Sequence, residues 1–386
     1  MNKRTIYCDH NSTTRTDPRV AEAMRQAAIE AFGNPSSSHL FGRQARAVLD
    51  SARADIARYI GAKPSEIILT GTGSESDNLA VFGSLYSSDA RGRHFVTVAS
   101  EHHAITHSAE WAKRAGFEIT VLPVDHLGRL DPDEFVRALK PTTQIASVML
   151  ANNEVGTIHP IARLASLARE RGVVFHTDAV QALGKIPVNV NELGVDLLSL
   201  AAHKFYGPKG VGVLYVRSGT RLASIIQGGG QETGRRPGTE NIAGAVGTAE
   251  AMKIIAGDPE EAGRVGAMAD ELRRRLHEQL DDIVFFGDPD HRLPNTVGVG
   301  FGGVDGESLS IALDLRGICV STGSACMTGA ARPSHVLTAM NVPERYLRGS
   351  IRFSFGREST PSDATTIADA VVAEVGRLRK MSPLAV

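Results

Sequence analysis

The chain has 386 residues, with 42 lysines and arginines against 43 aspartates and glutamates and a formal net charge of −1. This balance excludes an overall field that would favour nucleic acid or an anionic membrane, so we expect neither partner. Because no stretch approaches the roughly 20 apolar residues that span a bilayer, and the N-terminus lacks the apolar core of a signal peptide, we expect a cytoplasmic enzyme-sized protein.

Helical and strand patterns alternate from about residue 43 onward. Residues 44–60 repeat apolar side chains on one helical face, and the runs that follow are short and apolar. Such runs suit strands buried on both faces of a mainly parallel sheet. The predicted strands cover residues 67–70, 94–99, 119–122, 145–150, 173–175, 196–200 and 211–216. We therefore expect an α/β fold with helices flanking a mainly parallel central sheet.

The pattern changes after about residue 256. A long charged amphipathic helix is predicted over 261–280, followed by strands at 296–301 and 350–354 and a last helix over about 362–379. These elements are typical of a second, smaller α+β domain. We assign residues 14–259 to the large domain, and residues 1–13 and 260–386 to the small one.

Polar residues follow four of the predicted strands, and these residues are His102, Asn153, Asp178 with Gln181, and Lys204. In open α/β sheets, ligands bind beyond the carboxyl ends of the strands. Each residue alone is more often a helix cap or a loop hydrogen-bonder. Their shared position favours one common ligand site.

Lys204 and Asp178 have the chemistry of a pyridoxal phosphate (PLP) site. A lysine amine forms a Schiff base with the PLP aldehyde, and an acid pairs with the ring nitrogen so that the ring accepts the electrons of a carbanion. An exposed lysine and a capping aspartate would be the commoner interpretation of an arbitrary pair. Lys209 is the competing lysine, and we prefer Lys204 because it is closer to the strand end.

The cofactor phosphate requires backbone N–H donors at the start of a helix. The segment 70–80 places a glycine turn between a strand and a helical run, and Gly73 and Ser74 are the candidates. A nucleotide P-loop is excluded because no Gly-Lys-Ser/Thr follows. Many glycine-rich turns have only a conformational role, so this signal alone is weak.

The three cysteines are too few and too scattered for a disulfide framework. Cys326 lies among small residues between Gly323 and Gly329, which is loop composition, so its thiol could reach both a buried site and an acceptor. Cys8 and Cys319 each stand beside apolar strand residues, and we expect them to be structural.

With these features taken together, the sequence resembles the cysteine desulfurases, which are PLP enzymes of fold type I in the class-V aminotransferase family. The resemblance runs nearly end to end and is closest to the branch of sulfur donors for iron–sulfur clusters, nitrogenase maturation, tRNA thiolation and DNA phosphorothioation. Its motifs occur in the family's order and cover residues 9–14, 33–39, 73–78, 101–102, 152–156, 178–181, 203–204, 238–239, 323–326 and 350–352.

The resemblance implies a role for each matching residue. Lys204 would hold PLP, Asp178 would pair with its ring nitrogen, and His102 would stack on the ring and relay protons. Gln181 and Asn153 would bond the side of the phenolic oxygen. The phosphate would be bound by Gly73, Ser74 and His203, with Thr239 reaching the cofactor of a second subunit in a homodimer.

The reaction follows from the same resemblance. Arg352, together with Asn153, would bind the substrate carboxylate, for which a planar guanidinium is well suited. L-Cysteine would be converted to L-alanine, with its sulfur held on Cys326 as a persulfide and passed to an acceptor protein. Four residues depart from the usual pattern of the family: Ala201 replaces a phosphate-binding serine, Thr233 an arginine, Ser12 an alanine and Arg332 a glutamate.

Other functions remain open from the sequence. A PLP aminotransferase or a selenocysteine lyase would share Lys204 and Asp178 without requiring Cys326. A non-catalytic sulfur carrier is a further alternative, although the intact set of site residues argues against it. His103 and His107 stand four residues apart near His102, but they lack a matching Cys, Asp or Glu set, so we expect no metal site.

Overall fold

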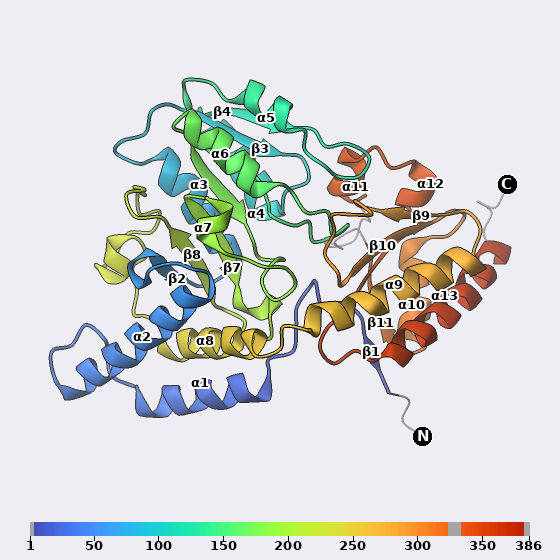
Figure 1. The fold of residues 1–386 in the computed structure, drawn as a ribbon, viewed down its shortest axis with the longest axis horizontal. Helices are drawn as coiled ribbons and strands as arrows, with labels where there is room; N and C mark the ends of the chain where they lie inside the picture. Colours follow the sequence, from blue (N-terminus) through green and yellow to red (C-terminus); the bar gives the residue numbers. More distant parts are fainter. Residues whose placement is uncertain (1–3, 323–332, 382–386) are drawn as a thin grey trace.

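The computed structural model describes residues 4–322 and 333–381. Figure 1 shows two sheets side by side, a larger one built from the first two thirds of the chain and a smaller one built mainly from the last third. Part of the sequence interpretation concerns residues outside the described ranges, namely Gly323, Cys326, Gly329 and Arg332.

The large sheet has seven strands in the order β2-β8-β7-β6-β5-β3-β4. Its central pairings are parallel, whereas β8 runs antiparallel to both β7 and β2. The strands are β2 (Ile67–Thr70), β3 (His94–Val98), β4 (Glu118–Leu122), β5 (Thr143–Ser147), β6 (Val174–Asp178), β7 (Leu197–Ala201) and β8 (Gly212–Val216). The predicted mainly parallel sheet is thus confirmed.

Helices cover both faces of this sheet because its strands are apolar on both sides. Leu197 packs into a cluster with helices α3 and α4, while its neighbour Leu198 packs into the cluster on the other face with α2, α5, α6 and α8. The helices are α1 (Pro18–Glu30), α2 (Leu40–Tyr59), α3 (Gly73–Leu85), α4 (His103–Arg114), α5 (Pro132–Ala138), α6 (Ile161–Glu170), α7 (Val190–Leu193) and α8 (Ile242–Ala256). Short 3-10 turns occupy η1 (Pro64–Glu66), η2 (Ala202–Lys204) and η3 (Gln231–Gly234).

Helix α1 precedes residue 43, where the sequence pattern first predicted regular structure. Only Val20 and Ala27 of its side chains are buried, so its apolar stripe is too narrow to stand out. Asp17 caps the helix by accepting from the backbone N–H of Arg19, and Pro18 occupies the first helical position. The capping residues therefore carried a signal that the apolar periodicity lacked.

The small sheet has the order β12-β13-β10-β9, and a separate parallel pair joins β1 to β11. These strands are β1 (Ile6–Tyr7), β9 (Ile283–Phe286), β10 (Thr296–Phe301), β11 (Ile318–Cys319), β12 (Ser321–Thr322) and β13 (Ser350–Ser354). The accompanying helices are α9 (Glu261–Gln279), α10 (Gly306–Asp314), α11 (His335–Ala339), α12 (Glu344–Leu347) and α13 (Pro361–Met381).

A hydrophobic cluster of its own lies between the small sheet and helices α9 and α13. It includes Ile6 and Cys8 from the N-terminal segment beside Leu272 and Phe353. The start of the chain therefore packs with its last third, as the proposed assignment of residues 1–13 requires. The exact domain boundaries stay a prediction. No helix of residues 4–322 or 333–381 is long and apolar enough to cross a bilayer.

Candidate active site

Lys204 lies just beyond the carboxyl end of β7, at the end of the short turn η2. Its Nζ donates to the backbone carbonyls of Asn11 and Ser12, both at 2.7 Å. Burial and then the nearby Arg352 guanidinium lower the pKa of the Lys204 amine to about 8, against a smaller opposing effect of Asp178. The amine is therefore poised to react near neutral pH.

Asp178 is the last residue of β6 and pairs with Ser199 of the neighbouring β7. Its side chain is buried, and Oδ1 accepts a hydrogen bond of 2.8 Å from the backbone N–H of Val180. Burial raises the pKa of Asp178 to about 6, while the Val180 N–H and the Lys204 cation oppose that rise. A further cationic partner beside this carboxyl would lower its pKa and favour the ionised form.

Asp77 is a second acid at the same place, which the sequence argument missed. It lies in α3 and is buried, and its pKa is raised well above the usual range by burial and then by Asp178. His176 Nε2 stands 3.7 Å from Asp77 Oδ1, yet burial lowers the pKa of His176 to about 3, so this ring is neutral. The available signal was an acidic residue just before the apolar run that begins at Leu79 in α3.

His102 caps helix α4, with its Nδ1 accepting from the backbone N–H of Ala104 at 3.1 Å. His102 is exposed as a residue, yet desolvation where its ring meets the protein, followed by the Lys204 cation, lowers the pKa of His102 to about 4. The ring is therefore neutral, and because Nδ1 is the acceptor, Nε2 carries the proton. One ligand atom each of Asp77, His102 and Asp178 lie within 4.8 Å of one another, a spacing that by distance alone would also suit a metal ion.

Glu101, beside His102, is a further buried acid that sequence reasoning did not assign a role. Its Oε1 accepts from the backbone N–H of Met149 at 2.7 Å. Burial, and then Asp178, raise the pKa of Glu101 well above its usual range. Glu101 links the start of α4 to the strand-end loop after β5, so it holds His102 in place rather than reaching the cavity.

The candidate phosphate residues Gly73 and Ser74 begin helix α3, and Thr72 caps it by accepting from the Glu75 N–H. A Cβ at Gly73 would lie 3.1 Å from the Ala201 Cβ, so glycine permits this close approach. His203 is near the same end of the sheet, where its Nδ1 is 3.0 Å from Thr13 Oγ1. Burial and then the cations Lys204 and Lys209 lower the pKa of His203 to about 4.

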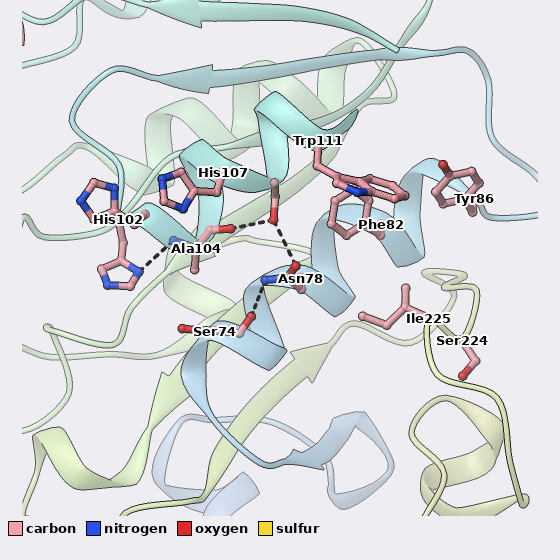
Figure 2. Close-up of a pocket in the computed structure, with 12 residues that line it drawn as sticks. Ser74, Asn78, Phe82, Tyr86, His102, Ala104, His107, Trp111, Ser224 and Ile225 are labelled. Atoms are coloured by element: carbon pink, nitrogen blue, oxygen red, sulfur yellow. Dashed lines mark hydrogen bonds between the residues drawn. The ribbon is translucent and has the colours of Figure 1, made fainter. Parts of the chain in front are cut away.

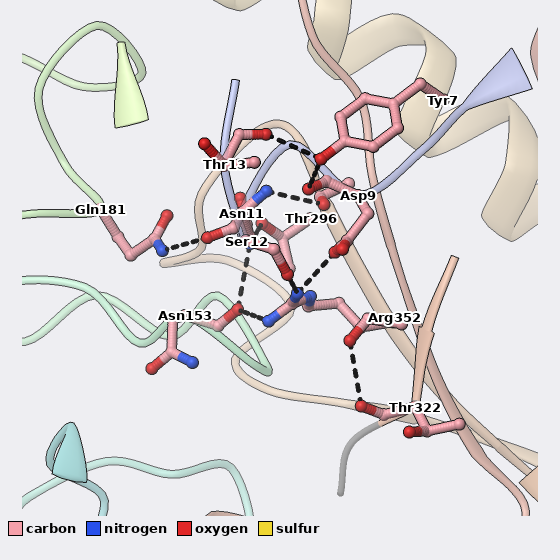
Figure 3. Close-up of polar contacts among 12 residues, drawn as sticks. Tyr7, Asp9, Asn11, Ser12, Thr13, Asn153, Gln181, Thr296, Thr322 and Arg352 are labelled. Atoms are coloured by element: carbon pink, nitrogen blue, oxygen red, sulfur yellow. Dashed lines mark hydrogen bonds and ion pairs between the residues drawn. The ribbon is translucent and has the colours of Figure 1, made fainter. Parts of the chain in front are cut away.

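Arg352 comes from β13 of the small sheet and faces the strand ends of the large one (Figure 3). Nη1 donates to the carbonyl of Asn153 at 3.0 Å, and Nη2 donates to Asp9 Oδ1 at 2.7 Å and to Ser12 Oγ at 2.8 Å. Its buried Nε has no partner among the described residues. The unusual Ser12 is thus part of the arginine's surroundings, and Asn153 contributes its backbone rather than its amide.

Gln181 and Asn11 connect the two halves of the site. Gln181 Nε2 donates to the Asn11 carbonyl at 2.8 Å, the same oxygen that receives Lys204. Lys185 donates to Gln181 Oε1 at 2.6 Å and to Asn11 Oδ1 at 3.1 Å. Asn11 and Lys185 were not predicted, because their importance depends on contacts between distant segments.

Thr239 is exposed on the loop after η3 and is not brought to the Lys204 site within this chain. The turn η3 that precedes this loop carries strained backbone at Glu232 and Thr233, whose φ angles are 48° and 58°. It is anchored by Arg53, which makes two hydrogen bonds to the Glu232 carboxylate. The predicted role of Thr239 toward a second subunit stays a prediction.

A cavity of about 750 Å³ opens beside His102 and Ser74. Figure 2 shows His102 at one end and an aromatic wall of Phe82, Trp111 and Tyr86 at the other. The rings of His103 and His107 also border it and stack at 5.0 Å between centroids. The cavity is therefore polar at the end lined by His102 and Ser74 and apolar at the far end, and neither Lys204 nor Asp178 lines it.

Residues 6–367 match the model of the class-V aminotransferases. The chain is 46% identical over 382 residues to "Cysteine desulfurase IscS" of Dictyoglomus turgidum, covering 99% of this chain and 97% of that protein. It is 43% identical over 384 residues to the protein of the same name from Methanosarcina thermophila, covering 99% and 94%. The chain belongs to the class-V aminotransferase family, and within it to the cysteine desulfurases.

Solved structures agree with this assignment. A "NIFS-LIKE PROTEIN" has a TM-score of 0.90 at 35% identity and covers 97% of this chain and 100% of its own. "SspA in complex with cysteine" has a TM-score of 0.82 at 33% identity and covers 92% and 100%. The predicted family, fold type and PLP dependence are confirmed.

The residues present fit PLP. Lys204, an amine of lowered pKa, and Asp178, a buried carboxyl of raised pKa, stand at the ends of the adjacent strands β7 and β6, a combination that an aldehyde and a protonatable ring nitrogen would satisfy together. The glycine at the start of α3 allows backbone N–H groups to approach a phosphate at the end of β7. Lys204, Asp178 and the α3 start are therefore the groups that would hold it.

Proposed function

We propose that this cysteine desulfurase acts on L-cysteine through Lys204, Asp178, His102 and Arg352 and carries the sulfur on Cys326. The observation that carries the assignment of roles is the lowered pKa of Lys204 beside the raised pKa of Asp178, at the carboxyl ends of β7 and β6. When bound, PLP supplies an aldehyde that condenses with amines and a ring that accepts electrons from carbon.

Asp178 sets the charge of the cofactor end of the site. Its burial makes an isolated carboxylate unfavourable, so a protonated ring nitrogen beside it would lower the free energy of both groups. Asp77 lies close to it, and burial and then Asp178 raise the pKa of Asp77 well above its usual range, which disfavours a second charge here. One of the two acids is therefore available to pair with the cofactor.

Lys204 is the proton carrier. With cysteine bound, the amine of pKa about 8 would remove the Cα proton of the substrate and return a proton later in the reaction. Its hydrogen bonds to the Asn11 and Ser12 carbonyls hold the nitrogen at a fixed place beside the substrate. His102, neutral with its proton on Nε2, can donate that proton toward the reacting sulfur.

Arg352 binds the substrate carboxylate. Its guanidinium is oriented by Asp9, Ser12 and the Asn153 carbonyl, which together hold two of its nitrogens, while the buried Nε has no partner among the described residues. Nη1 keeps a second N–H beyond its bond to Asn153, and a substrate carboxylate would accept from it. The substrate is thereby held between the two sheets.

Sulfur transfer takes place at Cys326, which lies outside the described residues. The Cys326 thiolate attacks the sulfur of the substrate, the S–S bond forms as the C–S bond breaks, and the electron pair stays on carbon, which takes up a proton to give alanine. The persulfide then passes its outer sulfur to the thiol of an acceptor protein. We further propose a homodimer in which Thr239 reaches the cofactor of the second copy.

The test follows alanine and persulfide from L-cysteine. Wild-type protein should release alanine and gain one sulfur on Cys326 by mass spectrometry. Borohydride reduction followed by peptide mapping should locate the cofactor on Lys204. Cys326→Ala should retain the cofactor spectrum and lose alanine release from cysteine. Full alanine production by that variant would instead favour an aminotransferase or a selenocysteine lyase.

A further inference from the structure

Lys185 is a lysine beside the cofactor residues to which the proposed reaction assigns no step. Its amine is enclosed by protein, and burial, then the cations Lys204 and Arg352, hold the pKa of Lys185 well below the usual range. Because an amine in such surroundings disfavours its charged form, a lysine is a costly choice at this position. Its hydrogen bonds therefore deserve a functional explanation.

The two groups that accept from Lys185 differ in what else orients them. The Asn11 amide is held independently, since Nδ2 donates to Thr296 Oγ1 at 2.9 Å and Oδ1 accepts from Asn295 Nδ2 at 3.0 Å. Within residues 4–322 and 333–381, the only hydrogen bond to Gln181 Oε1 comes from Lys185, at 2.6 Å. Removing the amine would leave Asn11 oriented, whereas Gln181 would keep only the bond from Nε2 to the Asn11 carbonyl and would lose the contact that fixes its Oε1 end.

The orientation of the Gln181 amide matters because its two ends have opposite hydrogen-bonding character. With Oε1 toward Lys185, Nε2 points to the Asn11 carbonyl and uses one of its two N–H groups there (Figure 3). A reversed amide would place two oxygens against each other. Even an uncharged lysine amine keeps two N–H donors, which match the two oxygens it contacts, so Lys185 favours this orientation at either charge.

We propose that Lys185 is a positioning residue that keeps the Nε2 end of Gln181, rather than Oε1, toward the phenolic oxygen of the cofactor. The inference rests on the proposed function, in which Gln181 lies on that side of PLP. An N–H donor stabilises the phenolic oxygen as an anion, whereas an amide oxygen would repel it. Through Gln181, Lys185 therefore lowers the pH at which the bound cofactor loses its proton.

The experiment titrates the absorbance of the bound cofactor in holoenzyme without substrate. Lys185→Met keeps the length of the side chain and removes the donor, and we expect the apparent pKa of the chromophore to rise by about one unit, the effect of one hydrogen bond to a charged group. Lys209→Met removes an exposed lysine from the neighbouring loop and should leave the titration unchanged. No shift in Lys185→Met overturns the inference.

A double-mutant cycle separates orientation from loss of a charge, since removing a cation would also raise the pKa of the chromophore. If Lys185 acts through Gln181, Lys185→Met should add no shift in a Gln181→Met background. A shift of undiminished size there overturns the inference. Lys185→Arg, which retains donors, should restore a titration close to wild type.

Two measurements keep the test interpretable. Thermal melting verifies folding, and Lys185→Ala, which removes the donor without adding volume, repeats the test if Lys185→Met does not fold. Failure of the proposed function would be seen in the wild type, as absence of a borohydride-reducible adduct on Lys204. A wild type that carries the adduct on Lys204, combined with an unshifted Lys185→Met, counts against the role of Lys185 alone.

Discussion

The two sheets contribute to the active site in different ways. The large sheet supplies groups whose proton affinities are changed by burial, as in the raised pKa of Asp178 and the lowered pKa values of His102 and Lys204. The small sheet supplies Arg352, whose position is set by hydrogen bonds to Asp9, Ser12 and Asn153. One side therefore adjusts chemistry through desolvation, and the other provides a fixed charge through geometry.

Substitutions on the two sides of the site should therefore have different effects. Changes on the large-sheet side should alter catalytic steps and their pH dependence, because they change which groups hold protons. Changes on the small-sheet side should alter substrate binding, because they change the place and shape of a charge.

Lys204→Ala should have the largest effect. Loss of the amine removes both the attachment of the cofactor and the base, and removal of a positioned base alone lowers kcat by about 10²- to 10⁴-fold. Alanine release from L-cysteine measures it. Lys209→Ala, at an exposed position of the following loop, is the matched control and should retain wild-type turnover. Comparable losses in both variants would contradict the assignment.

Asp178→Asn should lower kcat by about 10²- to 10³-fold, the usual cost of losing a positioned electrostatic partner. The side chain keeps its size and its bond to the Val180 N–H, so the fold should survive. Asp196→Asn is a suitable control, since Asp196 accepts from the Phe175 N–H at the opposite end of the same strands. If Asp178→Asn mainly raises KM, the large sheet would act on substrate binding, contrary to its proposed role in catalysis.

Arg352→Lys should raise the KM for L-cysteine by about 10- to 100-fold, because loss of a charge-assisted hydrogen bond is worth about 1.5–3 kcal/mol. Steady-state kinetics with cysteamine, which lacks the carboxylate, provides the control. The variant and the wild type should process cysteamine with similar kcat/KM. A defect of equal size with both substrates would show that Arg352 acts on catalysis rather than on carboxylate binding.

The stability of cofactor-free protein should depend on pH through Asp178. Because its folded pKa of about 6 exceeds the unfolded value, this group's stabilising contribution is present below the unfolded pKa and is lost as pH rises through about 6. Asp178→Asn removes that loss. The Tm of apo Asp178→Asn should therefore exceed that of the apo wild type more at pH 7 than at pH 4. Equal differences at both values would argue against a raised pKa.

Ser12→Ala should have the smallest effect. Arg352 loses one of three recorded hydrogen bonds but keeps those to Asp9 and to the Asn153 carbonyl. A hydrogen bond from a charged donor is worth about 1.5 kcal/mol at the low end of its range, and the guanidinium keeps its other bonds, so we expect a change in KM of no more than about tenfold, with kcat preserved. A change in kcat larger than that in KM would place Ser12 on the catalytic side.

Much of the architecture could be predicted because it follows from local patterns. Apolar runs predicted the strands of the large sheet. Asp178 and Lys204 each follow one of these strands, and because the carboxyl ends of parallel strands meet at one edge, both residues could be placed there from the sequence. Helix α1 was missed because it buries only two side chains. The roles of Thr239 and Cys326 stay predictions, one because it concerns a second subunit and the other because it lies outside the described residues.

The sequence by itself determined the family, the alternation of strands and helices, and which residue types stand at the strand ends, since these depend on order and spacing along the chain. Only the tertiary structure decided that Asp77 lies beside Asp178 and that Lys185 donates to Gln181. The physical reason is that desolvation and hydrogen bonding depend on what surrounds an atom in space. Contacts between distant segments of the chain therefore set the pKa values and the orientations of the side chains in the site.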